Sequence, residues 1–128
     1  MKFVKLLLLF SCVILAVMSR RNKRRSRWGA NGTGAANTCK DFKITGNRLF
    51  ASCTNLKGSQ VNTGIDMSKC LENVNGELKV GGGYQLTCQL AVNGKNLSGS
   101  CKNKNGTPTN ALLAINDAFG NMDGVLVC

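Results

Sequence analysis

The sequence contains no histidine, only one proline, one tryptophan and one tyrosine, and six acidic residues. Without histidine, neither a Ser-His-Asp triad nor a Cys-His pair can form. No sequence motif indicates that two of the carboxylates act as an acid–base pair, so the sequence does not indicate an enzyme. The cysteines lack the close spacing of a zinc site. We therefore expect neither a metal nor another cofactor.

Glycine and asparagine are abundant where proline is scarce, with 15 glycines in 128 residues. This composition favours many short strands joined by tight turns, and it argues against long helices. A chain of this length has room for one domain. We expect an all-β domain.

Positive charge is concentrated at the start of the chain. The net charge is +11, but eight of the 17 basic residues lie at positions 2–27. From Trp28 onward, nine basic residues face six acidic ones. A domain that binds nucleic acid is expected to carry a basic stripe, whereas these lysines are scattered as on an ordinary solvated surface. Nucleic acid is therefore not an expected partner.

The first residues have the pattern of a secretory signal peptide. Lys2 and Lys5 precede an apolar run at 6–18, which is too short to span a bilayer comfortably. We assign 1–19 to a signal peptide and expect a secreted, extracellular protein with no stable membrane span in its mature form. Residues 20–37 are interpreted as a basic, disordered lead-in or a propeptide ending after Arg25. Alternatively, the positive charge at 20–25 opposes translocation, and the apolar run at 6–18 then stays in the membrane as a short anchor.

Six cysteines remain when Cys12, inside the proposed signal peptide, is set aside: Cys39, Cys53, Cys70, Cys88, Cys101 and Cys128. Six cysteines allow about 15 pairings, so their number alone does not choose among them.

An internal repeat narrows the choice. Shifting the chain against itself by 48 residues gives ten identities within 46–80, where chance gives about two. A gap of one residue upstream of this window then aligns Cys39 with Cys88. If each copy is one structural unit, Cys39–Cys53 and Cys88–Cys101 are equivalent bridges. A third bridge between Cys70 and Cys128 is favoured over two free thiols or an intermolecular link.

Each copy has the pattern of strands and hairpins. Leu49, Ala51 and Cys53 alternate with outward residues, and a short helical turn is expected at 66–69. Asn75-Gly76 and Asp123-Gly124 lie between apolar residues, where they favour type I′ turns with two positive φ angles.

The two Cys loops, each followed by an Asn-x-Asn/Asp-Gly-x-Leu hairpin, resemble the cyanovirin-N family from about residue 38 to 128. The resemblance implies two pseudo-symmetric, intertwined repeats, at about 39–80 and 88–128, which form two lobes of triple-stranded sheet plus hairpin. It also implies a metal-independent lectin for mannose-rich glycans with one site per lobe. Intertwined repeats make a domain-swapped homodimer a further expectation.

Carried over by position, the resemblance implies two groups of site residues. The first is Glu72, Asn73, Asn75, Gly83, Tyr84, Thr87, Lys102, Asn103 and Lys104. The second is Thr38, Thr54, Asn55, Asn121 and Asp123. Among these site residues, Tyr84 is the only aromatic side chain available to stack on a sugar. Leu86 departs from the family pattern, which has an acidic residue there.

Other interpretations of these residues stay open. The hairpin asparagines are also ordinary turn formers, residues 81–83 can form a bulge, and the lysines can be simple surface residues. A structural or protein-binding module that has lost sugar binding is the alternative function. Three glycosylation sequons begin at Asn31, Asn96 and Asn105.

Overall fold

The computed structural model describes residues 32–128. The first repeat comprises β1 (Gly32–Gly34), α2 (Ala35–Thr38), β2 (Cys39–Thr45), β3 (Arg48–Thr54), β4 (Gln60–Asp66), the 3-10 helix η1 (Met67–Lys69), β5 (Leu71–Val74) and β6 (Glu77–Val80). The second comprises the 3-10 helix η2 (Tyr84–Leu86), β7 (Cys88–Asn93), β8 (Asn96–Lys102), β9 (Pro108–Ala114), α3 (Ile115–Ala118), β10 (Gly120–Met122) and β11 (Val125–Val127). Apart from these short helices the described chain is strand and turn, as the composition predicts.

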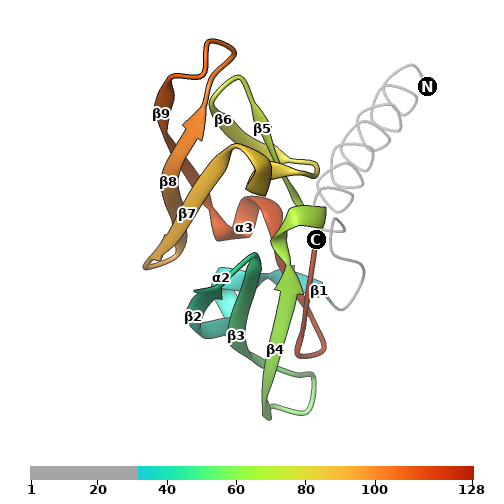
Figure 1. Ribbon diagram of the computed structural model, residues 1–128. Coiled ribbons are helices and arrows are strands. Elements are labelled where there is room, and N and C mark those ends of the chain that lie inside the picture. The colour runs from blue at the N-terminus through green and yellow to red at the C-terminus, as the bar shows by residue number, and fades with distance from the viewer. Residues whose placement is uncertain (1–31) are drawn as a thin grey trace, which may run out of the picture.

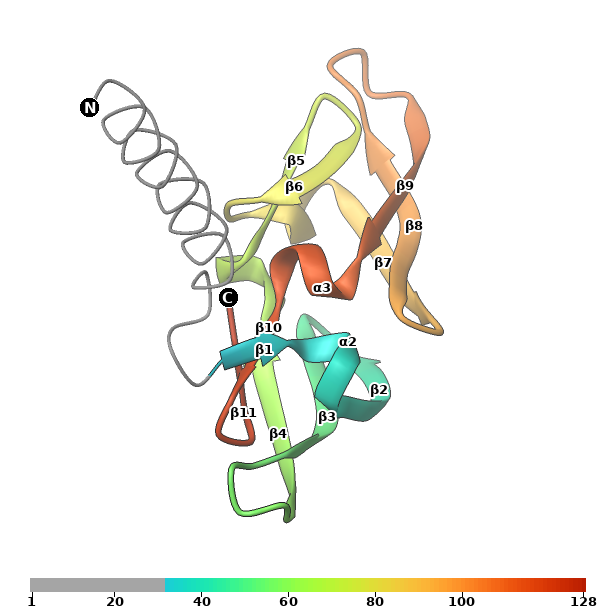
Figure 2. The ribbon, with the colours of Figure 1, turned by 180° about the vertical axis from the view of Figure 1, so that it is seen from behind.

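The two repeats exchange their hairpins (Figures 1 and 2). Strands β2, β3 and β4 form one sheet, and β7, β8 and β9 form another. The β5–β6 hairpin follows the first sheet in sequence but contacts β9 of the second. The β10–β11 hairpin follows the second sheet but contacts β3, β4 and β1. Lobe one is therefore β1–β4 with β10–β11, and lobe two is β5–β6 with β7–β9. The predicted pair of intertwined, pseudo-symmetric lobes is confirmed.

Alternation along the central strands builds the interior of each lobe. In β3, Leu49, Ala51 and Cys53 are buried while Arg48 and Phe50 are exposed. This period of two is that of a strand with one face on the core. The sequence pattern identified this inner row correctly.

The core repeats the symmetry of the chain. Leu49, Met67 and Leu71 are fully buried in the first repeat, and their equivalents Leu97, Ile115 and Phe119 are fully buried in the second. Each such side chain contributes about 1.5–3 kcal/mol by leaving water. Burial in matching pairs means that both lobes are stabilised by the same arrangement.

Both hairpin turns have the predicted backbone. Asn75 and Gly76 have φ of 52° and 90°, and Asp123 and Gly124 have φ of 51° and 86°. Two successive positive φ angles define a type I′ turn, whose twist matches that of the flanking strands. The predicted helical turn is η1, where Asp66 accepts hydrogen bonds from the backbone N and Oγ of Ser68 at 3.0 and 2.6 Å. These bonds hold the pKa of Asp66 below its ordinary value.

All three predicted disulfides are present. Cys39–Cys53 and Cys88–Cys101 join directly paired residues of β2–β3 and β7–β8. Cys70–Cys128 links the residue before β5 to the end of the chain. The third bridge has no symmetric equivalent and ties the first repeat to the second.

The one-residue gap in the alignment of the repeats corresponds to a β-bulge in the first repeat. The pairing of β2 with β3 runs from Lys40 opposite Ser52 to Lys43 opposite Phe50, so one strand has an additional residue there. The pairing of β7 with β8 is continuous. The Cys39–Cys53 loop is accordingly one residue longer than its equivalent.

The assignment of residues 20–37 to a disordered lead-in was wrong for its last part. Gly32–Gly34 pair with β10, and Ala35 and Ala36 are buried in the core. The proposed signal peptide 1–19, residues 20–31 and the sequon at Asn31 lie outside the described residues. Within residues 32–128, no helix has the length and apolar character needed to cross a bilayer.

Candidate functional site

Each lobe contains a junction where an exchanged hairpin meets the loop that follows a disulfide-bonded strand. In lobe two the β5–β6 hairpin meets Lys102 and the loop 103–107 that follows it. In lobe one the β10–β11 hairpin meets Thr54 and the loop 55–59. Most of the site residues predicted from the sequence lie at these two junctions.

Asn73 holds the lobe-two junction together through its side-chain amide. Its Nδ2 donates to Thr87 Oγ1 and to the carbonyl oxygen of Lys102, both at 2.8 Å. Its Oδ1 accepts a hydrogen bond from the backbone N of Gly76 at 2.8 Å. Both amide protons are therefore used within the protein, which makes Asn73 a positioning residue.

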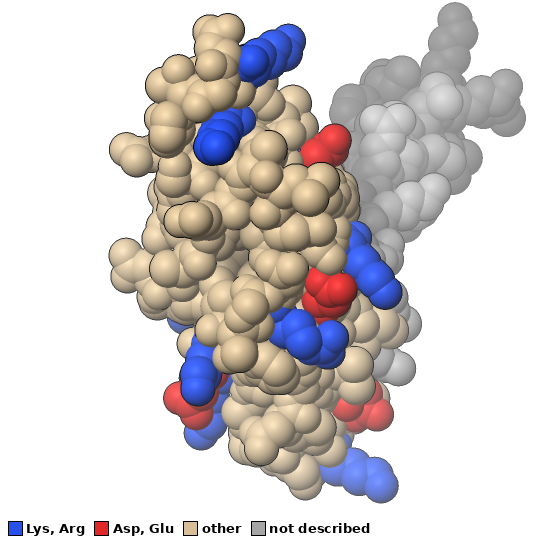
Figure 3. Space-filling view, viewed as in Figure 1, with Lys and Arg blue, Asp and Glu red and all other residues tan. Residues whose placement is uncertain are grey.

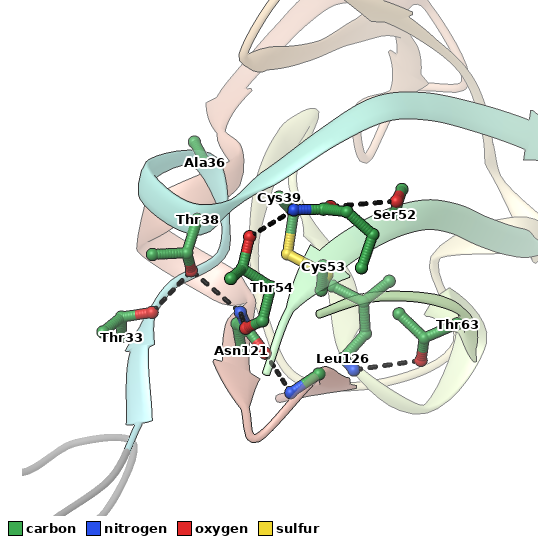
Figure 4. The surroundings of a disulfide bond; sticks show 12 residues. Thr33, Ala36, Thr38, Cys39, Ser52, Cys53, Thr54, Thr63, Asn121 and Leu126 are labelled. Carbon is green, nitrogen blue, oxygen red and sulfur yellow. Dashed lines mark hydrogen bonds between the residues drawn. A yellow bond between two sulfur atoms is a disulfide. The ribbon is translucent and has the colours of Figure 1, made fainter. Parts of the chain in front are cut away.

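Asn121 repeats this arrangement in lobe one (Figure 4). Its Nδ2 donates to Thr38 Oγ1 and to the carbonyl oxygen of Thr54, both at 2.9 Å, and its Oδ1 accepts from the backbone N of Gly124 at 2.8 Å. The Asn121 side chain is only 3% exposed. Its amide is therefore used within the protein, as that of Asn73 is, and its contact with a sugar stays a prediction.

The turn residues reach across each junction. Asn75 Oδ1 accepts from the backbone N of Lys104 at 2.9 Å, and Asp123 Oδ1 accepts from the backbone N of Leu56 at 2.9 Å. Asn75 Nδ2 and Asp123 Oδ2 make no hydrogen bond with the described residues, and both side chains are exposed. Each turn therefore presents one polar atom to solvent in a fixed place.

Asn55 and Asn103 shape the loops that the hairpins meet. Asn55 Oδ1 accepts from the backbone N of Lys57 and Ser59 at 3.0 and 2.9 Å. Asn103 Oδ1 accepts from Asn105 and Thr107 in the same way, both at 3.0 Å. Such side-chain turns fix a loop without regular secondary structure. These two residues build the loops and are only partly exposed.

Tyr84 does not provide a stacking surface. It begins η2 and is 3% exposed, against η1, β5 and β7. Burial raises the pKa of its hydroxyl above 10.0, with a smaller contribution from the charge of Asp66. Gly83 precedes it with a φ of 82° and donates its backbone N to Ser68 O at 2.8 Å. Packing of η2 against η1 therefore encloses the ring, and a contact between Tyr84 and a sugar stays a prediction.

Glu72 is exposed and lies beside the backbone of Gly81. A Cβ added at Gly81 would lie 2.5 Å from the Glu72 Cβ and Oε2, so only glycine leaves room for this carboxylate. The exposed Glu72 carboxylate is therefore available to accept hydrogen bonds from a ligand.

A depression of about 280 Å³ adjoins the lobe-two junction. Its lining includes the predicted site residues Thr87 and Lys102 together with Leu86, Gln89 and Pro108. Leu86 is 81% exposed, so an apolar surface lies where the family pattern has an acid. The depression thus offers hydroxyl and ammonium groups beside an apolar wall.

Charged side chains are dispersed over the face of the molecule seen in Figure 3, with acidic and basic groups interspersed. The described part of the chain therefore shows no basic stripe on this face. No group of three or more metal-ligating side chains occurs among residues 32–128.

Two contributions to the junctions were missed by sequence reasoning. Thr109 Oγ1 lies within hydrogen-bonding distance of the carbonyl oxygens of Gly76 and Cys101, at 3.0 and 2.8 Å, so its one proton joins the hairpin or the strand β8. Thr33 Oγ1 lies 2.7 Å from Thr38 Oγ1. Neither threonine recurs in the other repeat, so the internal comparison could not reveal it.

Residues 36–127 match the family model of the CVNH domain. No curated protein sequence shows significant similarity to the chain. Several solved structures share the fold, all at low identity.

The chain is similar to a designed cyanovirin-N homologue lectin, at 23% identity and a TM-score of 0.68, with 74% of this chain and 98% of that chain covered. It is similar to the CVNH protein of Gibberella zeae, at 22% identity and a TM-score of 0.65, covering 74% and 97% of the two chains. It is also similar to microvirin, solved with mannobiose, at 21% identity and a TM-score of 0.51, covering 64% and 85%. The family match spans most of the chain, and the exchanged hairpins agree with it: the chain belongs to the CVNH domain family.

Proposed function

We propose that this protein is a secreted lectin that binds mannose-rich glycans without a metal, with one site at each junction. The observation that carries the proposal is the duplicated junction, in which Asn73 and Asn121 hold turns that present Asn75 and Asp123 to solvent. A rigid turn with fixed polar atoms suits a ligand recognised through its hydroxyl groups.

Lobe two carries the larger set of accessible polar groups. Glu72, Asn75, Thr87, Lys102 and Lys104 are all exposed around its junction. A carboxylate accepts hydrogen bonds from two adjacent hydroxyls, while ammonium groups donate to ring and hydroxyl oxygens. In lobe one the corresponding groups are Asp123 and the hydroxyls of Thr38 and Thr54.

The relatives support the sugar class. Microvirin, which shares the fold, was solved with mannobiose. Two weak sites on one rigid molecule would bind a branched glycan more tightly than either site alone, through multivalency.

Secretion is supported by the three disulfides, because such bonds persist in oxidising compartments. The apolar run at 6–18 provides the corresponding targeting segment. Intact mass before and after reduction tests this proposal: six thiols should appear only on reduction, and the chain should start after the apolar run.

A second candidate function is a structural or protein-binding module. The internal use of Asn73 and Asn121 and the burial of Tyr84 favour it, because these residues then serve the fold rather than a ligand. Under this hypothesis the hairpins are retained and sugar is not bound.

Calorimetric titration with an α1,2-linked dimannoside separates the two functions. The wild-type protein should bind two sugars. Glu72→Ala with Lys104→Ala should remove the lobe-two site, and Asp123→Asn should weaken the lobe-one site while keeping a residue that tolerates positive φ. Asn75→Asp, which keeps a residue suited to the turn, is the control for folding. Absence of heat from wild-type protein at millimolar sugar would reject the lectin in favour of the module.

A further inference from the structure

The two repeats differ on the outer face of one sheet. In β3 and β4, Phe50 lies directly opposite Gly64. The equivalent pair in β8 and β9 is Ser98 opposite Leu112. The large and small members of the pair have changed places, and only the first repeat has an aromatic ring there.

Gly64 makes the position of this ring attainable. A Cβ added at Gly64 would lie 2.7 Å from both Cδ1 and Cε1 of Phe50, which no side chain tolerates without movement. The ring therefore rests against the backbone of β4 and remains 38% exposed. The part of the ring that stays exposed is accessible to a ligand.

The β-bulge of the first repeat lies beside the ring. It places Asp41 at a φ of 58°, one of three non-glycine residues with positive φ among those described. The other two form the hairpin turns, where the type I′ geometry requires this conformation. At Asp41 the inserted residue directs a carboxylate to the edge of the same surface, and bulges commonly redirect side chains in this way.

These features line one depression of about 430 Å³, larger than that beside the lobe-two junction. Its wall comprises Asp41, Lys43, Phe50, Ala51, Ser52, Asn62, Thr63 and Gly64. An apolar ring is thus surrounded by a carboxylate, an ammonium, an amide and hydroxyl groups. The Arg48 guanidinium carbon lies over the ring at 5.9 Å from its centroid, close to the limit of cation–π attraction, so only a weak contact competes with a ligand for the ring.

We propose that this surface, the Phe50 site, binds a pyranose ring by stacking its apolar face on Phe50. Asp41 and Asn62 then bond the hydroxyls at the rim of the sugar. The inference rests on the proposed lectin function for the ligand class, but the site is separate from both junctions and has no counterpart in the second repeat.

The stacking geometry selects the kind of sugar. A β-linked glucose unit has all its substituents equatorial, so axial C–H bonds form a complete apolar face. In α-linked mannose the axial 2-hydroxyl interrupts one face, and the axial glycosidic oxygen interrupts the other. The Phe50 site therefore takes β-linked glucose-type units, whereas the junctions are proposed for mannose.

Amide chemical shifts of the full chain, titrated separately with cellotriose and with α1,2-mannobiose, test the proposal. Cellotriose should shift the amides of Phe50, Asn62 and Gly64 and leave those of Asn75 and Asp123 unchanged. Phe50→Ser with Gly64→Leu installs the pair found in the second repeat, and should weaken cellotriose binding about tenfold. Phe50→Leu, which keeps an apolar side chain without a ring, should have a similar effect.

Two variants sharpen the result. Asp41→Asn keeps a residue that adopts positive φ and should weaken cellotriose binding without changing the fold. Leu112→Ala, at the equivalent strand position of the other sheet, should leave it unchanged. Mannobiose should bind all four variants as it binds the wild type.

The outcomes separate this proposal from the previous one. If cellotriose shifts these amides and mannobiose does not bind, the Phe50 site is supported and the junction sites are rejected. If mannobiose binds and cellotriose does not shift these amides, only the Phe50 site is overturned. Unchanged cellotriose affinity in Phe50→Leu would also overturn it. Shifts of these amides with protein concentration, without sugar, would identify the surface as a contact between two copies and overturn it as well.

Discussion

Asn73 and Asn121 are the residues on which both junctions depend. Each connects a hairpin turn to a threonine hydroxyl and to the carbonyl oxygen at the end of a strand from the other repeat. A buried amide that satisfies three partners is expensive to remove, because each partner then loses its bond without gaining water.

We therefore expect Asn121→Ala to lower the free energy of unfolding by about 2–4 kcal/mol, since it leaves Thr54 O and the backbone N of Gly124 unpaired. Urea denaturation measures this. Asn110→Ala, an exposed residue of β9, is the control and should change stability by less than about 0.5 kcal/mol. Equal losses in the two variants would show that the amide does not hold the junction.

Tyr84 gives a pH dependence. Its folded-state pKa is raised above 10.0, chiefly by burial. The unfolded chain ionises first, so the contribution to stability is complete below about pH 10 and is lost as pH rises through the folded-state pKa. Denaturation midpoints at alkaline pH should fall more steeply for the wild type than for Tyr84→Phe. Parallel profiles would contradict this assignment.

Sequence identity between the repeats located Asn73 and Asn121 but did not reveal their roles. An asparagine kept in both copies is equally compatible with a sugar contact and with a junction bond. The burial of Tyr84 could not be predicted either, because η1 and η2 come from different repeats and meet only in the folded chain.

Among the elements, those determined by local sequence were predictable. The alternation of apolar and polar residues predicted the buried row of β3, and the Asn-Gly and Asp-Gly pairs predicted the two turns. Strand β1 was not predictable, because Gly32–Gly34 carry no strand pattern and pair with β10, which is remote in sequence. The bulge was visible only as one additional residue between Cys39 and residue 46, which places it in β2 but does not reveal its conformation.

The loop 103–107 leads to a prediction about glycosylation. The sequon at Asn105 is exposed and adjoins Lys104, whose backbone N bonds Asn75 across the lobe-two junction. We expect protein from a glycosylating host to bind mannobiose at fewer sites than bacterial protein. Asn105→Gln should abolish this difference.

Calorimetric stoichiometry of both preparations, with occupancy checked by mass spectrometry, decides the matter. Occupied Asn105 with unchanged stoichiometry would place the lobe-two site elsewhere. The sequon at Asn96, at the start of β8, lies at the far end of that strand from Lys102 and serves as the control.

At the scale of the whole molecule, exchange of the hairpins makes each lobe depend on both repeats. Residues 81–83 connect the repeats, and the resemblance implies that such molecules can swap halves into a dimer. That state remains a prediction for this chain, tested by its mass in solution. The Cys70–Cys128 disulfide joins the repeats covalently across 58 residues.

Replacing Cys70 and Cys128 together with serine should therefore destabilise the protein. On the chain-entropy account a loop of 58 residues contributes about 4 kcal/mol, against about 3 kcal/mol for the 14-residue loop of Cys39–Cys53. Thermal unfolding of this double variant, and of a second one in which Cys39 and Cys53 are replaced by serine, shows which loss of stability is larger. A smaller loss for the Cys70 and Cys128 pair would contradict the view that this bridge restricts the unfolded chain most.

The central claim is that this fold binds carbohydrate without a metal. A glycan array probed with the purified protein, in the presence and absence of a chelator, measures this most directly. We expect retention on glycans that end in α1,2-linked mannose, competition by free mannobiose, and no effect of the chelator. Binding to no glycan on the array, or binding lost on chelation, would contradict the claim.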